Sequence, residues 1–141
     1  ERIDALRLRL LELVQRDADC FAPLVRAYGM AKDDPKRGET LERETLRAAQ
    51  PPLEMMRACR DALTEIAVLA EKGSRLAVSD AGCAAACCRA ALESAALNVF
   101  INTKTLRDRA AADALNAQAE ALLQTGVPLA ERIYAAVRTN F

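Results

Sequence analysis

Apolar residues recur every three or four positions along most of the chain, which is the spacing of one face of an α-helix. The first such segment runs from about Ile3 to Tyr28. Its apolar stripe comprises Leu6, Leu10, Leu13, Leu24 and Ala27. Gly29 follows as a C-terminal stop signal. No alternation typical of a strand is found anywhere, so the pattern predicts an all-α bundle.

The segment from 36 to 48 is charged nearly all round and is predicted to be a solvent-facing helix or a mobile arm. Asp34 and Pro35 are predicted to be the N-cap and the first-turn proline of this segment. Pro51 and Pro52 are expected to end it. A further helix is then predicted over 53–71.

Ser79 is the predicted N-cap of a central helix that runs from about Asp80 to Asn102 and is rich in alanine. Alanine lets neighbouring helices come close. Thr105 and Asp108 form a predicted capping box before the last helical region. That region is expected to be broken or kinked at Gly126 and Pro128, before a final apolar stripe.

The composition fits a single domain over residues 1–141, with 52% hydrophobic residues, only 4% aromatic residues and a formal net charge of zero. The balanced charge gives no reason to expect nucleic acid or an anionic membrane as a partner. No uninterrupted run of about 18 apolar residues is present, so no membrane span is predicted. No signal-peptide pattern is visible, so we expect a cytoplasmic protein.

Five cysteines are present and histidine is absent. Cys83 and Cys87 share a helix face, with Cys88 beside them, but without histidine or a second cysteine pair this spacing is weak for a metal site. We therefore expect no metal and small thiols buried among alanines. Any acid–base chemistry must use carboxylates, lysine or bound water.

Asp17 lies on the apolar stripe of the first helix, where desolvation raises the pKa of a carboxyl and suits it to proton transfer. The alternative is a surface ion pair with Arg16 or a neighbouring helix. Asp80 lies in the first turn of the central helix, where the helix dipole stabilises a negative charge without any function. Lys32 lies in an exposed turn, as a surface lysine or the counter-charge of an anionic ligand.

Asn98 and Asn102 lie one helical turn apart in the motif LNVFIN. An amide in a tightly packed core is costly unless it is hydrogen-bonded. We therefore expect this pair either to fix the helix against a neighbouring helix or subunit, or to contact a ligand.

Four segments together resemble the formiminotetrahydrofolate cyclodeaminase family, which includes methenyltetrahydrofolate cyclohydrolases. They match in order and in spacing, over nearly the whole chain from about Leu10 to Leu122. The segments are DADCFAPLVRAYGMAK (17–32), PLEMM (52–56), AVSDAGCAA (77–85) and LNVFIN (97–102).

The resemblance implies an all-helical fold that dimerises through helices and holds a folate in a cleft. It implies conversion of formiminotetrahydrofolate to methenyltetrahydrofolate with release of ammonia, with the folate as substrate and no further cofactor. Asp17 or Asp80 would be the acid–base group, Lys32 would meet the glutamate end, and Asn98 and Asn102 would orient the pterin or the helices. The alternatives are the cyclohydrolase reaction and a non-catalytic helical dimerisation module.

The chain departs from the family pattern at three places. The family's glycine-rich Gly-Gly-Gly-Ser segment, upstream of the first matching helix, is not among residues 1–141. The family's Leu-Pro-Lys is replaced by Met30, Ala31 and Lys32. Both asparagines of its Gly-Asn-Pro-Asn turn are lost at Ser74 and Leu76. These changes affect the expected substrate choice and activity more than the fold.

Overall fold

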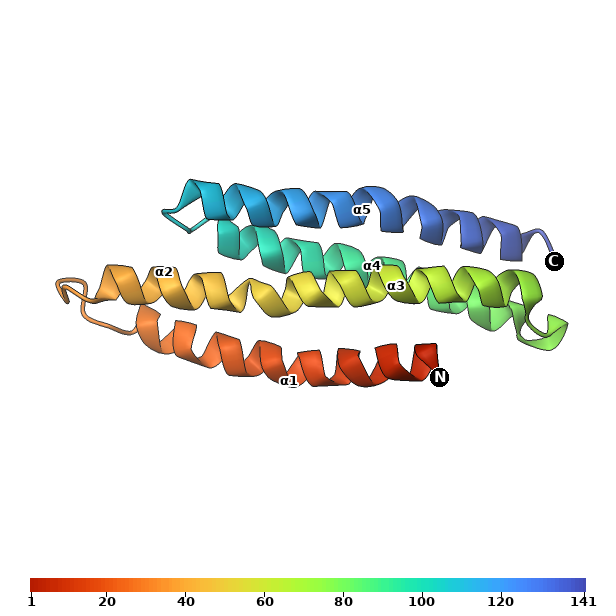
Figure 1. Cartoon of the computed structure of the whole chain (residues 1–141), viewed down its shortest axis with the longest axis horizontal. Helices are drawn as coiled ribbons and strands as arrows, with labels where there is room; N and C mark the ends of the chain where they lie inside the picture. The colour runs from red at the N-terminus through yellow and green to blue at the C-terminus, as the bar shows by residue number, and fades with distance from the viewer.

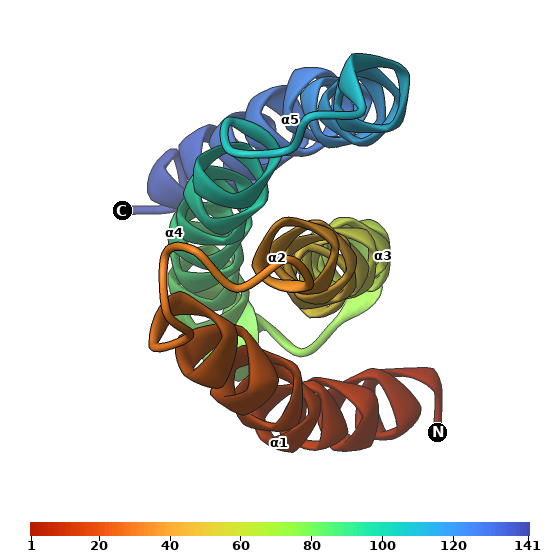
Figure 2. The same cartoon turned by 90° about the vertical axis from the view of Figure 1, so that its left-hand side faces the viewer.

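The computed structural model describes residues 1–141 and confirms the all-α prediction, with five α-helices and one short 3-10 helix. Their bounds are α1 (Arg2–Tyr28), α2 (Arg37–Ala48), α3 (Gln50–Lys72), η1 (Arg75–Ala77), α4 (Val78–Thr103) and α5 (Arg109–Arg138). The bundle is elongated, and α2 and α3 follow one another along nearly the same line (Figure 1). Seen end-on, α1, α4 and α5 form an arc around α2 and α3 (Figure 2).

Helix α2 ends at Ala48, just before the proline pair, as predicted, but the pair itself belongs to the next helix. Helix α3 begins at Gln50, and Pro51 and Pro52 occupy its first turn, where the missing amide hydrogens have no helical partner in any case. Both prolines are buried. Only Ala49 separates α2 from α3, so the two helices nearly continue one another.

The segment forms helix α2, which agrees with the helical alternative, and one side of this helix is buried. Glu44, Thr45 and Ala48 face the bundle. The Glu44 carboxylate is stabilised by Arg43, whose guanidinium lies 2.8 Å away, while Oε2 of Glu44 has no hydrogen-bond partner. Leu46, one of the few large apolar residues of this helix, is exposed.

Two predicted caps are corrected. Helix α4 begins at Val78, so Ser79 lies inside its first turn, and it is Ser74 that accepts a hydrogen bond from the amide of Leu76 at the start of η1. Asp108 alone caps α5, by accepting a hydrogen bond from the Ala111 amide at 3.0 Å. The Thr105 hydroxyl donates to the carbonyl of Asn102 instead.

Helix α5 continues through Gly126 and Pro128 without a break. The glycine serves close packing: a Cβ placed on Gly126 would lie 2.5 Å from Cδ2 of Leu92 on α4. Gly82 on α4 has the same role, because a Cβ there would lie 2.9 Å from Cγ1 of Val137 on α5. Because Gly82 and Gly126 have no side chain, α4 and α5 can approach each other closely.

The core consists of two apolar clusters along the bundle. The larger has 12 buried residues, centred on Leu53, Met56, Leu92 and Val99. The smaller has 7, including Leu63 and the α5 residues Ala130, Ile133 and Val137.

Helix α1 is held to α3 by ion pairs on its outer side. Glu54 accepts hydrogen bonds from Arg16 at 2.8 and 3.0 Å and from Arg9 at 3.0 Å, and Arg2 pairs with Glu65. The hydrogen bonds from Arg16 lower the pKa of Glu54, and Glu54 raises the pKa of Arg16. The backbone of α1 lies close to α2 and α3 and farther from α4.

One segment, Arg75–Thr103, which contains α4, is long and apolar enough by length and composition to cross a membrane. The core helix of a soluble bundle passes the same test. Within α4, Arg89 forms ion pairs with Glu93 and with Glu131 of α5, at 3.5 and 2.9 Å. The composition of α4 is therefore weak evidence for a membrane span.

Candidate functional site

An open apolar groove lies where α1 and α4 diverge. Its volume is about 590 Å³, and α3 contributes to its lining. Ile3, Leu10 and Val14 of α1 face Ala81 and other small residues of α4 across it. This volume falls within the usual range for small-molecule sites, roughly 300–1,000 Å³.

Few polar residues line the groove, and two of them carry opposite charges. Asp80 comes from the first turn of α4, and Arg7 comes from α1. Sequence reasoning found Asp80 but missed Arg7, which stands between Leu6 and Leu8 among many similar surface arginines. An apolar slot with one anionic and one cationic residue can hold a flat ring and orient its polar groups.

Asp17 is half-buried on α1, and burial raises the pKa of its carboxyl, which agrees with the first of the two alternatives that the sequence left open. The alternative ion pair with Arg16 is not formed, because that guanidinium binds Glu54. Asp17 lies one helical turn beyond Val14, so it stands just past the end of the groove. Since α1 and α4 start at the same end of the bundle, Asp80 lies toward the opposite end of the groove (Figure 1).

The two asparagines are not core residues, contrary to the expectation. Asn98 is exposed and Asn102 is partly exposed. Each side-chain amide donates to a carbonyl one turn earlier in its own helix: Asn98 to Ser94 at 3.2 Å, and Asn102 to Asn98 at 2.9 Å. Neither bonds another helix of the chain. Both carbonyl oxygens on the side chains therefore stay free for a ligand or for another molecule.

The predicted site residues do not converge within one chain. Asp80 and Asn98 are 18 residues apart, which is five full turns, so they lie on the same line along α4 but about 27 Å apart. Lys32 lies in the exposed α1–α2 turn, at the same end of the bundle as Asn102 (Figure 1). The chain therefore places Asp80 at one end, Lys32 and the asparagines at the other, and Asp17 between them.

The cysteines fall into two environments. Burial raises the pKa of the Cys59 thiol to about 11 and also raises the pKa of Cys88, so both favour the neutral thiol. Cys20 is buried too. Cys83 and Cys87 are exposed on α4, which corrects the expectation that the thiols of this helix are buried among alanines.

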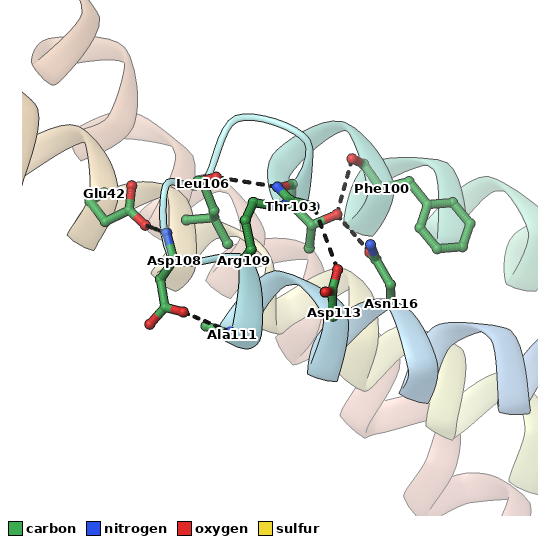
Figure 3. A network of polar contacts seen from close by, with 9 residues as sticks. All are labelled: Glu42, Phe100, Thr103, Leu106, Asp108, Arg109, Ala111, Asp113 and Asn116. Atoms are coloured by element: carbon green, nitrogen blue, oxygen red, sulfur yellow. Dashed lines mark hydrogen bonds and ion pairs between the residues drawn. The ribbon is translucent and has the colours of Figure 1, made fainter.

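A polar network fixes the α4–α5 turn (Figure 3). The Thr103 hydroxyl donates to Oδ1 of Asn116 at 2.7 Å, and the Arg109 guanidinium donates to the carbonyls of Thr103 and Leu106. The Glu42 carboxylate of α2 accepts the backbone amides of residues 107 and 108, and these bonds lower its pKa. The network has a structural role and keeps this end of α4 in place.

The sequence profile described as formiminotransferase-cyclodeaminase matches residues 1–121. The chain belongs to this family. A methenyltetrahydrofolate cyclohydrolase of Methylorubrum extorquens is 36% identical over 144 aligned residues, which cover 99% of this chain and 69% of that protein. The fold matches the crystal structure of a formiminotetrahydrofolate cyclodeaminase from Thermotoga maritima with a TM-score of 0.87. That match is 24% identical and covers 96% of this chain and 66% of the other. The chain thus spans about two thirds of the length of each relative, within a family of folate one-carbon proteins.

Proposed function

We propose that this protein is a folate one-carbon enzyme that hydrolyses methenyltetrahydrofolate, and that the groove between α1 and α4 binds the folate. The observation that carries the proposal is the groove itself, an apolar slot with Asp80 and Arg7 in its lining. The 36% identical cyclohydrolase supports the choice of reaction.

In this reaction water adds to the carbon that bridges two folate nitrogens. One carbon–nitrogen bond then breaks, so that methenyltetrahydrofolate and water give formyltetrahydrofolate and one proton. A base must accept a proton from the attacking water, and an acid must protonate the departing nitrogen. Asp80 lines the groove and is exposed to water, so we assign it the role of base.

Asp17 stands at the opposite end of the groove from Asp80, so it does not act on the same carbon, and the departing nitrogen takes its proton from bound water. The raised pKa of Asp17 keeps a larger share of its carboxyl protonated than at an ordinary aspartate, which suits it to hydrogen-bond the far edge of a bound ligand. Arg7 would meet the anionic glutamate portion of the folate, or a ring carbonyl, from the opposite wall.

The cyclodeaminase reaction is the second candidate, supported by the family profile. Here a folate nitrogen attacks the formimino carbon, and one proton is taken up as ammonia leaves. The same carbon reacts in both cases, and Asp80 would serve both reactions with the proton moving in opposite directions. The groove alone does not favour one of them, so the two substrates must be compared directly.

The test incubates the purified chain separately with methenyltetrahydrofolate and with formiminotetrahydrofolate, while the methenyl absorbance is followed. Loss of absorbance beyond the spontaneous rate supports the cyclohydrolase, and a rise with ammonia release supports the cyclodeaminase. Asp80→Asn is expected to lower the rate by at least about 100-fold, the scale of general acid–base catalysis. Asp19→Asn, an exposed carboxylate elsewhere on α1, is the matched control and should keep the wild-type rate. Spontaneous rates with both substrates would refute the enzyme and leave a helical dimerisation module.

A further inference from the structure

Two exposed thiols lie one turn apart on α4, outside the groove proposed for the folate. Cys83 and Cys87 are both exposed, and neither belongs to the lining of that groove. They occupy positions i and i+4 of one helix, so their side chains leave the same side of α4. The pair is therefore a cluster of soft donor atoms that the proposed function does not use.

The spacing of the pair is too wide for a disulfide. Residues four apart on a helix have Cβ atoms about 5–6 Å apart, whereas a disulfide needs about 3.5–4.5 Å. The same spacing suits a single metal ion between the two sulfurs. Two metal–sulfur bonds of about 2.3 Å in line span about 4.6 Å, which the sulfurs reach by rotation about their Cα–Cβ bonds.

The helix around the pair leaves room for an ion. The residues one turn away from either thiol on the exposed side of α4 are small and are themselves exposed: Ser79, Ala86, Ala90 and Ala91. No large side chain on α4 therefore stands between the two sulfurs or shields them from water, so an ion can reach both from solvent.

The number of donors decides which metal the pair suits. Zinc takes three or four protein ligands. No group of three or more histidine, cysteine, aspartate or glutamate side chains in this chain is arranged to hold a metal ion. Cys88 follows Cys87 directly, but it lies about 100° further round the helix and lines the groove. Two thiolates alone suit a soft ion of low coordination number, and thiolate ligands select Cu(I) among such ions.

We propose that Cys83 and Cys87 bind one Cu(I) ion per chain, held between their two sulfurs. The ion replaces the proton of each thiol, so Cu(I) and two thiols give a bis-thiolate complex and two protons. Copper keeps its oxidation state, and no disulfide forms. The site is separate from the folate groove and does not depend on which folate reaction the groove supports.

The site is tested by competition for Cu(I), which needs no activity measurement. Cu(I) held by bicinchoninate is titrated with the chain under anaerobic, reducing conditions, and the colour of the bicinchoninate complex falls as the protein takes the ion. The native chain should take up one Cu(I) and release two protons into a weakly buffered solution. X-ray absorption of the loaded chain should show two sulfur neighbours around copper.

Three variants locate the ion. Cys83→Ser and Cys87→Ser should each weaken Cu(I) binding by at least about a hundredfold, because one thiol cannot form a two-sulfur site. Cys88→Ala is the matched control, since it removes the adjacent thiol on another side of the helix and should bind Cu(I) like the native chain. Helical circular dichroism should be unchanged in both serine variants, because the two positions are exposed.

Four results would overturn the proposal. Native affinity in Cys83→Ser or in Cys87→Ser would show that the pair does not hold the ion. Loss of binding in Cys88→Ala would place the ion at another pair of thiols. One Cu(I) for every two chains would show an ion shared between molecules. Release of the bound Cu(I) by an excess of Zn(II) would show that the site is not selective for a soft ion of low coordination number.

Discussion

Gly126→Ala is the substitution that most sharply tests how α4 and α5 pack. The new Cβ would lie 2.5 Å from Cδ2 of Leu92, well inside van der Waals contact, and 3.8 Å from Cδ1 of Leu63. Leu92 is fully buried in the larger core cluster. One side chain or one helix must therefore shift.

The magnitude follows from two opposing effects. Alanine in a helix interior is favoured over glycine by about 1 kcal/mol. Inserting a methyl group into a well-packed core costs about 1–3 kcal/mol. We therefore expect Gly126→Ala to lower the free energy of unfolding by about 1 kcal/mol. Gly38→Ala is the matched control, because its new Cβ meets only the flexible end of Arg107, at 3.0 Å. That variant should be unchanged or stabilised by up to about 1 kcal/mol.

The assay is equilibrium urea unfolding followed by circular dichroism, in the native and Leu92→Ala backgrounds. Leu92→Ala alone should cost about 2–5 kcal/mol and leave a cavity beside position 126. In that background Gly126→Ala should become stabilising, because the new methyl group fills vacated space. An equal effect of Gly126→Ala in both backgrounds would show that α4 and α5 do not meet at Leu92, and would refute the packing described above.

Three further predictions concern carboxylates. Asp17→Asn should raise the melting temperature at pH 7, because the pKa of Asp17 in the folded protein is above the ordinary 3.8 and its ionised form therefore opposes folding. The increase in melting temperature should vanish below pH 3.8, and an unchanged melting temperature at pH 7 would contradict this prediction. Glu54→Gln should destabilise the fold at pH 7, because it removes the ion pair between Glu54 and Arg16. In urea titrations this destabilisation should shrink as the pH falls below 4.5, the ordinary pKa of glutamate, and should disappear below the lowered pKa of Glu54 in the folded protein. Glu42→Gln should cost about 1 kcal/mol by chemical unfolding, since a carboxylate oxygen that accepts backbone amides becomes an NH₂ group; native stability would show that the α4–α5 turn does not depend on Glu42.

The helices could be predicted because apolar spacing is a local property of the sequence. Their junctions depend on the neighbours instead. Helix α2 ends before Pro51 and Pro52 as expected, but the next helix was predicted to begin at Leu53 and begins at Gln50, because a proline is well suited to a first turn. Gly126 and Pro128 were expected to break α5, but the helix is continuous. The glycine is needed there because a side chain at position 126 would collide with Leu92.

The candidate site was harder to predict because α4 is apolar on nearly every side. A helix without a polar face does not reveal from sequence which side enters the core. Asn98 was therefore placed in the core, although it lies on the exposed side. The desolvation of Asp17 could be foreseen because α1 has a clear apolar stripe. The role of Arg7 could not, since only the divergence of α1 from α4 creates the groove that it lines.

The most direct test of the account is a calorimetric titration of the chain with tetrahydrofolate, paired with a thermal-shift assay. A folate-binding groove predicts saturable heat and a higher melting temperature, both weakened at least tenfold in apparent affinity by Arg7→Ala. No heat and no thermal shift with the native chain would contradict the claim that these helices enclose a folate site.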